Sequence, residues 1–393
     1  MKFNKWTVGL AAAGLVTLPS LTHAVEANMV QTMAASTTLS GYVDVAAQWN
    51  LGTGNVNKPG YAFNATGAGS KADGFNLNIV DLVLDKPLDE TPWAAGYHVE
   101  LGFGPDAGTL GTDSSFLNAG DMGIRQAYVA LRTPLLGSNG IDWKIGVFDT
   151  IIGYESTSGP NNPNYTRSYG YTIEPTTHEG ILGTYKICDS ASVTLGVANT
   201  FGPQTGLRQV TKEDTKVWMA SLALTAPQNW GWLAGSSMTA GVINGFSSAV
   251  SAAGGPLGNG NLTHYYAGLT IATPVTGLKA GVAVDYRHIH DTAAKDDTWV
   301  YGVYASFQAT EKLSLHARAE YVDDKAGLIV PAGSGINVFA VTATVQYDLW
   351  KNVLSRAEIR WDNTQNGQLY GGIAGAPTLR NAVMLAANVV YKF

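Results

Sequence analysis

The feature that most constrains this chain is a period-two alternation of apolar and other residues that recurs along most of its length. Residues 93–104, 313–321 and 353–362 each place apolar side chains at every second position. A β-strand points successive side chains to opposite faces, so this pattern predicts sheets with one apolar and one water-facing side. No later segment reaches the roughly 18 consecutive apolar residues of a membrane-spanning helix.

The connections between these segments alternate between short and long. Short ones include residues 188–190 and 310–312, and long ones include residues 51–74 and 363–378. Outer-membrane barrels combine short periplasmic turns, longer outer loops and an even strand number. We therefore expect an all-β fold, a transmembrane antiparallel up-and-down β-barrel of about 16 strands.

Composition agrees with a barrel and excludes several other classes. Charged residues make up 14% of the chain, against roughly 25% in an average soluble domain. The net charge of -6 argues against nucleic acid as a partner. A single cysteine, Cys188, excludes an internal disulfide.

The N-terminus has the proportions of a secretory signal peptide. Lys2 and Lys5 precede an apolar stretch over residues 6–21, and small residues follow at 22–24. We expect a signal peptide at 1–24, a short lead at 25–36 and the barrel at 37–393, located in the outer membrane. A retained anchor helix is the alternative.

The C-terminus predicts the strand that closes the barrel. Apolar side chains occupy alternate positions from Val383 to Phe393. Such a strand ending in Phe resembles the signature that the barrel-assembly machinery recognises, so we assign Tyr391 and Phe393 to an assembly signal. We expect it to pair with the first strand, near residues 39–49.

Several segments resemble a known family. They are FNLNIVDLVLDKPLDE (75–90), GFGPDA (102–107), IRQAYVALRTPL (124–135), IDWKIGVFDTIIGYES (141–156) and NYTRSYGYTIEPTTHEG (164–180). They are similar to the putative β-barrel porin-2, OmpL-like family of bacterial outer-membrane proteins. The resemblance is most specific over residues 75–187. It implies a porin, and it supplies neither a substrate nor catalytic residues.

Residues 151–177, after the expected fifth strand, form the longest connection without a strand pattern. In position and length this segment looks like the loop that folds into the lumen of general porins. It contains Pro160, Pro163 and Pro175, which stiffen it, and four tyrosines. Its charged residues are Glu155, Arg167 and Glu174, with Glu179 just beyond. We expect these four at a pore constriction; a loop on the outer surface is the alternative.

Strand parity predicts which charged side chains face the lumen. An arginine on the lipid face costs roughly 2–4 kcal/mol at the bilayer midplane, whereas a water-filled lumen solvates it. The residues assigned to the lumen wall are Glu100, Arg125, Asp285, Arg287, Arg318, Glu320, Arg356, Glu358, Arg360 and Asp362. We expect Glu155 and Glu174 to face the arginines of this wall and to create a transverse field.

The sequence offers no catalytic or metal-binding pattern that outweighs the channel interpretation. The GxSxG elbow of a serine hydrolase is absent. His288 and His290 share a face at a strand end, and we interpret them as a solvated rim instead of metal ligands. We expect no enzyme activity, no cofactor and no metal.

Three functions remain open at this stage. The first is a porin for passive diffusion of small hydrophilic solutes, embedded in outer-membrane lipid. The second is a substrate-selective channel, for example for sugars, with the tyrosines of residues 151–177 as a stacking track. The third is a non-conducting barrel that serves as a receptor or structural anchor. A homotrimer is compatible with this size.

Overall fold

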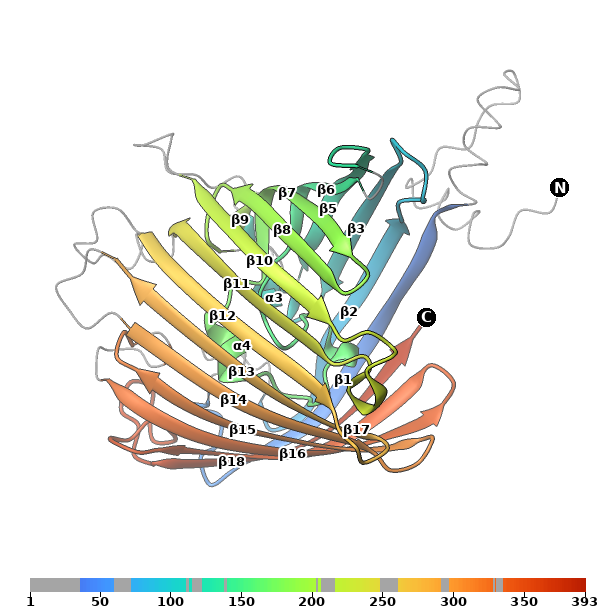
Figure 1. Cartoon of the computed structure of the whole chain (residues 1–393). Coiled ribbons are helices and arrows are strands. Elements are labelled where there is room, and N and C mark those ends of the chain that lie inside the picture. Colours follow the sequence, from blue (N-terminus) through green and yellow to red (C-terminus); the bar gives the residue numbers. More distant parts are fainter. Residues whose placement is uncertain are drawn as a thin grey trace, which may run out of the picture.

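The computed structural model is a closed barrel of 16 strands, each antiparallel to both neighbours (Figure 1). It describes residues 36–59, 72–110, 113–114, 122–137, 140–202, 204–205, 216–247, 261–290, 297–327, 329 and 335–393. The predicted signal peptide and nearly all of the lead lie outside these residues. Within them, no helix has the length and apolar character of a membrane span.

The strand order around the barrel follows the chain. The barrel strands are β1 (Thr38–Leu51), β2 (Gly74–Lys86), β3 (Ala95–Phe103), β5 (Met122–Thr133), β6 (Ile141–Asp149), β7 (Thr177–Cys188), β8 (Ala191–Ala198), β10 (Val217–Thr225), β11 (Ser237–Phe246), β12 (Asn261–Ala272), β13 (Leu278–Ile289), β14 (Asp297–Gln308), β15 (Leu313–Asp324), β16 (Ile336–Trp350), β17 (Val353–Thr364) and β18 (Asn381–Lys392). The predicted fold class and strand number are confirmed.

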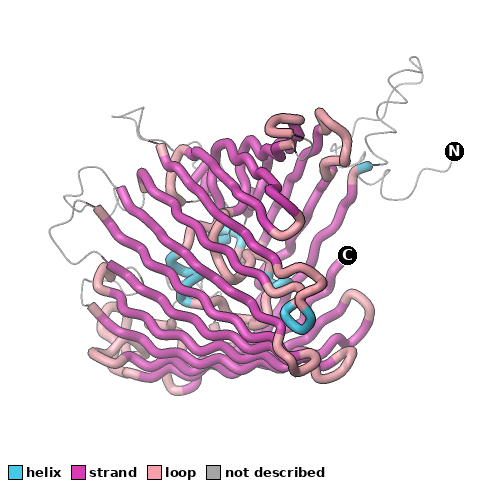
Figure 2. Tube along the Cα trace, in the orientation of Figure 1, coloured by secondary structure: helices cyan, strands magenta, loops and turns pink. Residues whose placement is uncertain are grey.

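The remaining elements are short and lie in the connections. They are α3 (Ala107–Leu110), η1 (Gly159–Asn161), α4 (Tyr169–Ile173), η2 (Gly231–Leu233) and a two-residue parallel pair of β4 (Asp113–Ser114) with β9 (Gln204–Thr205). Figure 2 shows how little of the chain is helical. The β6–β7 connection contributes η1 and α4, and it determines the shape of the lumen.

The barrel closes between β1 and β18, as predicted. Their register runs from Tyr42 opposite Lys392 to Leu51 opposite Val383. Phe393 extends the ladder by one residue, because its N–H donates to the Gly41 carbonyl at 3.0 Å and its carbonyl accepts from the Gly41 N–H at 3.1 Å. Closure leaves no strand edge to expose unpaired backbone groups to lipid.

The two faces of each strand differ sharply in polarity. On β17 the side chains of Arg356 and Arg360 are 2% and 0% exposed, whereas Ile359 between them is 49% exposed. The same alternation continues on β15, where Arg318 is buried and Leu315 is exposed. Apolar residues therefore cover the outside, and charged residues point into the barrel.

One expected strand begins later than its pattern suggests. Trp93 belongs to the β2–β3 turn, with φ of 63° and 71% exposure. Positive φ is unfavourable for a bulky side chain and is tolerated at a tight turn. Its indole therefore protrudes from a turn at the barrel rim.

Candidate pore constriction

The β6–β7 connection, residues 150–176, folds into a compact unit that we name the inner loop. Pro160 lies in the first turn of η1, where its missing N–H is tolerated. Ser168 caps α4 by accepting the Tyr171 N–H at 3.0 Å. Asn162 closes a local turn by accepting the Ser156 N–H at 2.7 Å. The proline, serine and asparagine content thus specifies a stiff loop.

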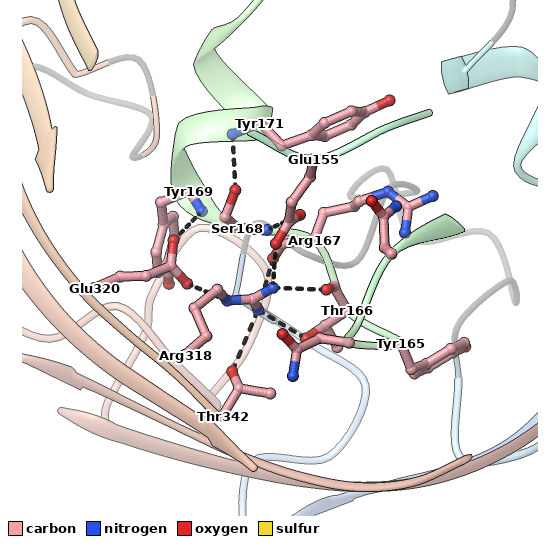
Figure 3. Close-up of polar contacts among 12 residues, drawn as sticks. Glu155, Tyr165, Thr166, Arg167, Ser168, Tyr169, Tyr171, Arg318, Glu320 and Thr342 are labelled. Atoms are coloured by element: carbon pink, nitrogen blue, oxygen red, sulfur yellow. Dashed lines mark hydrogen bonds and ion pairs between the residues drawn. The ribbon is translucent and has the colours of Figure 1, made fainter. Parts of the chain in front are cut away.

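Arg318 on β15 is the centre of the contacts between this loop and the wall (Figure 3). Its guanidinium donates to Glu155 Oε1 at 2.6 Å, the Thr166 carbonyl at 2.9 Å and the Arg167 carbonyl at 3.2 Å. Its Nε lies 2.9 Å from Glu320 Oε2. The side chains of Arg318 and Glu155 are both 0% exposed. This buried arginine therefore fixes the loop to β15 from inside the barrel.

Strand β17 holds the same loop with alternating charges. The Arg356 guanidinium donates to the carbonyls of Gly159, Asn162 and Asn164 at 3.0–3.2 Å. Glu358 accepts the N–H groups of Tyr165 at 2.6 Å and Thr166 at 2.9 Å. Arg360 donates to the Arg167 carbonyl at 2.6 Å. Between η1 and α4 the loop backbone has no regular secondary structure to pair its polar groups. The arginines of β17 donate to its carbonyls and the glutamate accepts from its N–H groups, so the wall satisfies them.

The base of the loop has a different environment from the one expected. Glu174 caps α4, and burial together with the neighbouring Asp285 carboxylate raises the pKa of Glu174 well above its ordinary value. Asp285 on β13 lies 2.8 Å from His264 Nε2. The expectation that Glu174 faces the wall arginines is wrong, because its nearest charged neighbour is a second acid.

One other assigned residue lies away from its expected position. Glu179 belongs to β7, and it shares strand parity with Ile181, which is 41% exposed, so it faces outward. Its assignment to the constriction loop is therefore wrong. Arg287 on β13 does face inward, and it donates to the Ile173 carbonyl at 2.8 Å.

Open space remains on the opposite side of the lumen. A cavity of about 410 Å³, which we name the passage, separates the inner loop from the wall formed by β1, β2, β3, β5 and β6. Its polar lining includes Tyr42, Asp81, Glu100, Arg125, Asp149 and Ser158. Arg125 lies 3.4 Å from Glu100 and 3.2 Å from Asp149. The loop thus occupies the β15–β17 side and leaves the β1–β6 side open.

Two acids of the passage, Asp81 and Asp149, are absent from the predicted set. An irregularity in the β1–β2 pairing places Asp44 opposite Ile79 and Val45 opposite Leu77, so Asn78 is the extra residue. Odd-numbered residues such as Leu77 point outward before the bulge, and even-numbered residues such as Val80 point outward after it. The side on which Asp81 lies therefore does not follow from simple alternation. Asp149 is the last residue of β6, whereas the sequence pattern places it in the loop that follows the strand.

The two histidines at the rim contact each other and an aspartate. His288 Nδ1 lies 2.8 Å from Asp297 Oδ1. The rings of His288 and His290 pack edge to face, with a distance of 4.6 Å between their centroids. Across the described part of the chain, no cluster of three or more His, Cys, Asp or Glu side chains is arranged to hold a metal ion.

The fold is similar to those of solved outer-membrane channels. OmpF of Salmonella typhi, solved with daunomycin, superposes with a TM-score of 0.61 at 12% identity over 91% of this chain and 97% of that one. DcaP, an outer-membrane channel of Acinetobacter baumannii, gives 0.59 at 14% identity over 91% and 97%. The trimer form of OmpT from Vibrio cholerae gives 0.56 at 12% identity over 91% and 99%. At such identities the likeness shows the fold alone.

No curated protein sequence matches the chain. A family model does match it, over residues 36–393, and its description is "Putative beta-barrel porin-2, OmpL-like". The match extends over the whole barrel and agrees with its closed sheet of 16 strands. The chain therefore belongs to the putative beta-barrel porin-2, OmpL-like family and is a porin of the outer membrane.

Proposed function

We propose that this porin lets small hydrophilic solutes diffuse passively through the passage, and that the inner loop sets its size limit. The observation that carries the proposal is the one-sided attachment of the loop. Buried hydrogen bonds from Arg318, Arg356 and Arg360 hold it against β15 and β17. The space that remains for solutes is the cavity beside β1–β6.

The same contacts support a different position for the expected transverse field. Glu155 is neutralised by Arg318 within a buried pair, so these two charges hold the loop and contribute little to the solvent-filled passage. The charges that face solutes are instead Asp81, Glu100, Arg125 and Asp149 on the β2–β6 wall. Ion selectivity is therefore assigned to this wall.

The sugar-selective alternative has less support. Tyr165, Tyr169 and Tyr171 are 8%, 1% and 6% exposed. Tyr154 stacks on Tyr304 with a ring-centroid distance of 3.9 Å. These rings fill space between the loop and the wall, so they offer no exposed stacking track for a sugar.

Planar-bilayer recording with neutral polymers of graded size tests the proposal. We expect steady ohmic conductance that polymers smaller than the passage reduce and larger polymers leave unchanged. A silent channel contradicts passive diffusion and favours the receptor or anchor role. Saturable block by a sugar at low concentration favours the substrate-selective channel.

We also propose a cleaved signal peptide at 1–24, recognition of the C-terminal strand by the barrel-assembly machinery, and a homotrimer. The trimer form of OmpT supports the last of these by analogy of fold. N-terminal sequencing of the protein extracted from membranes should start near Val25. Native mass spectrometry should give three times the mass of the mature chain.

A further inference from the structure

The wall of the passage contains more carboxylates than cations. Asp81, Glu100 and Asp149 line it, together with the cations Arg125 and Lys392. Arg125 already interacts with Glu100 and Asp149. Gln126 Nε2 also donates to Glu100 Oε2 at 2.8 Å. Of the three acids, Asp81 is therefore the one that has no arginine partner.

Among the acids that line the passage, Asp81 is the one with a buried oxygen atom that lacks a hydrogen-bond partner. Its side chain is 2% exposed, and its Oδ2 atom has no hydrogen-bond partner. The salt bridges among the described residues include none to Asp81. Asp81 pairs across the sheet with Gly102, two positions from Glu100, so the two acids are diagonal neighbours on the inner face. A cation placed between them gains from both charges.

The opposite wall of the passage is uncharged. The inner loop presents Ser156, Ser158, Pro160 and Asn161 to it. A protonated primary amine has three N–H donors, which two carboxylates and one hydroxyl or carbonyl satisfy with charge-assisted hydrogen bonds. The described residues show no cluster suited to a metal ion, and a volume of about 410 Å³ accommodates a small organic solute.

We propose that Asp81 and Glu100 form a binding site for primary ammonium groups, which makes small aliphatic amines a preferred class of solute. The inference deepens the proposed diffusion function and rests on it. Asp81 is the specificity-determining residue, because Glu100 is shared with Arg125 and Asp81 is not.

The test is current block by 1,4-diaminobutane in planar bilayers, with tetramethylammonium as the cation that lacks N–H donors. We expect reversible block of the parent channel by the diamine and weaker block by tetramethylammonium. Asp81→Asn should raise the blocking concentration about tenfold, the scale of one charge-assisted hydrogen bond. Asp189→Asn makes the same change in an exposed turn outside the passage and should leave the block unchanged.

If Asp81→Asn does not insert into the membrane, a second variant tests the same site. Ser158→Lys supplies a tethered ammonium from the loop side and should weaken the diamine block to a similar extent. Equal block of parent and Asp81→Asn, equal block by the two cations, or no block of a conducting parent would each overturn the site. A silent parent channel contradicts the proposed function itself; titration calorimetry of diaminobutane into the detergent-solubilised barrel then decides whether the site exists.

Discussion

Removing the Arg318 side chain should release the inner loop without opening the barrel. In Arg318→Met, Glu155 loses its partner in a pair whose side chains are both 0% exposed. Two loop carbonyls, at Thr166 and Arg167, lose a donor as well. Removing one partner of a buried ion pair costs about 3–5 kcal/mol. The strand ladders of β15 do not use this side chain, so the sheet should persist.

Hydrogen exchange of the loop amides measures this cost directly. The N–H groups of Tyr165 and Thr166 donate to Glu358, and that of Tyr169 donates to Glu320, so these amides exchange only when the loop leaves the wall. A loss of about 3–5 kcal/mol speeds their exchange roughly a hundredfold to several thousandfold. Mass spectrometry of peptides spanning residues 160–172, produced by digestion after timed labelling and quenching, resolves that range.

Arg132→Met is the matched control. Arg132 pairs with Asp142 at 2.6 Å, but the two side chains are 25% and 42% exposed. An exposed pair is worth about 0.2–1 kcal/mol, so this variant should change loop exchange less than about fivefold. If Arg318→Met exchanges its loop amides no faster than the Arg132→Met control, the arginine does not hold the loop and the reasoning is refuted.

Two further outcomes follow from the structure. Burial and the adjacent Asp285 raise the pKa of Glu174, so the folded protein binds more protons than the unfolded one between the ordinary pKa of glutamate and the raised value. Stability should then fall as pH rises through that window, and Glu174→Gln should flatten the dependence of melting temperature on pH; an unchanged slope contradicts the pairing. Deleting Phe393 removes only the last hydrogen-bonded pair of the seam, with Gly41, so inserted protein should conduct normally while the inserted amount in cells falls; a normal insertion yield contradicts its role as an assembly signal.

Much of the fold could be predicted because a barrel repeats one local rule. Period-two alternation identifies the strands, and the solvation cost of a charge in lipid determines which face Arg318, Arg356 and Arg360 occupy. The position of the loop after the fifth barrel strand was also readable, because strand count depends only on local pattern. These inferences need no knowledge of which residues meet across the lumen.

The charge arrangement of the constriction could not be predicted, because it depends on contacts between residues far apart in the sequence. The Glu155–Arg318 contact joins residues 163 apart in sequence, and nothing local indicates which wall the loop lies against. The approach of Glu174 to Asp285 depends on the same choice. Asp81 was missed because the irregular pairing at Asn78 changes strand parity.

The most direct test of the account compares single-channel conductance before and after loop shortening. Deleting residues 156–168 removes η1 and the segment that Arg318, Arg356 and Arg360 hold, and it leaves β6 and β7 with their full pairing register. We predict that the shortened protein inserts as a barrel, conducts more current than the parent and admits larger neutral polymers. If it inserts normally but its conductance and polymer cut-off match those of the parent, the inner loop does not constrict the pore and the account is contradicted.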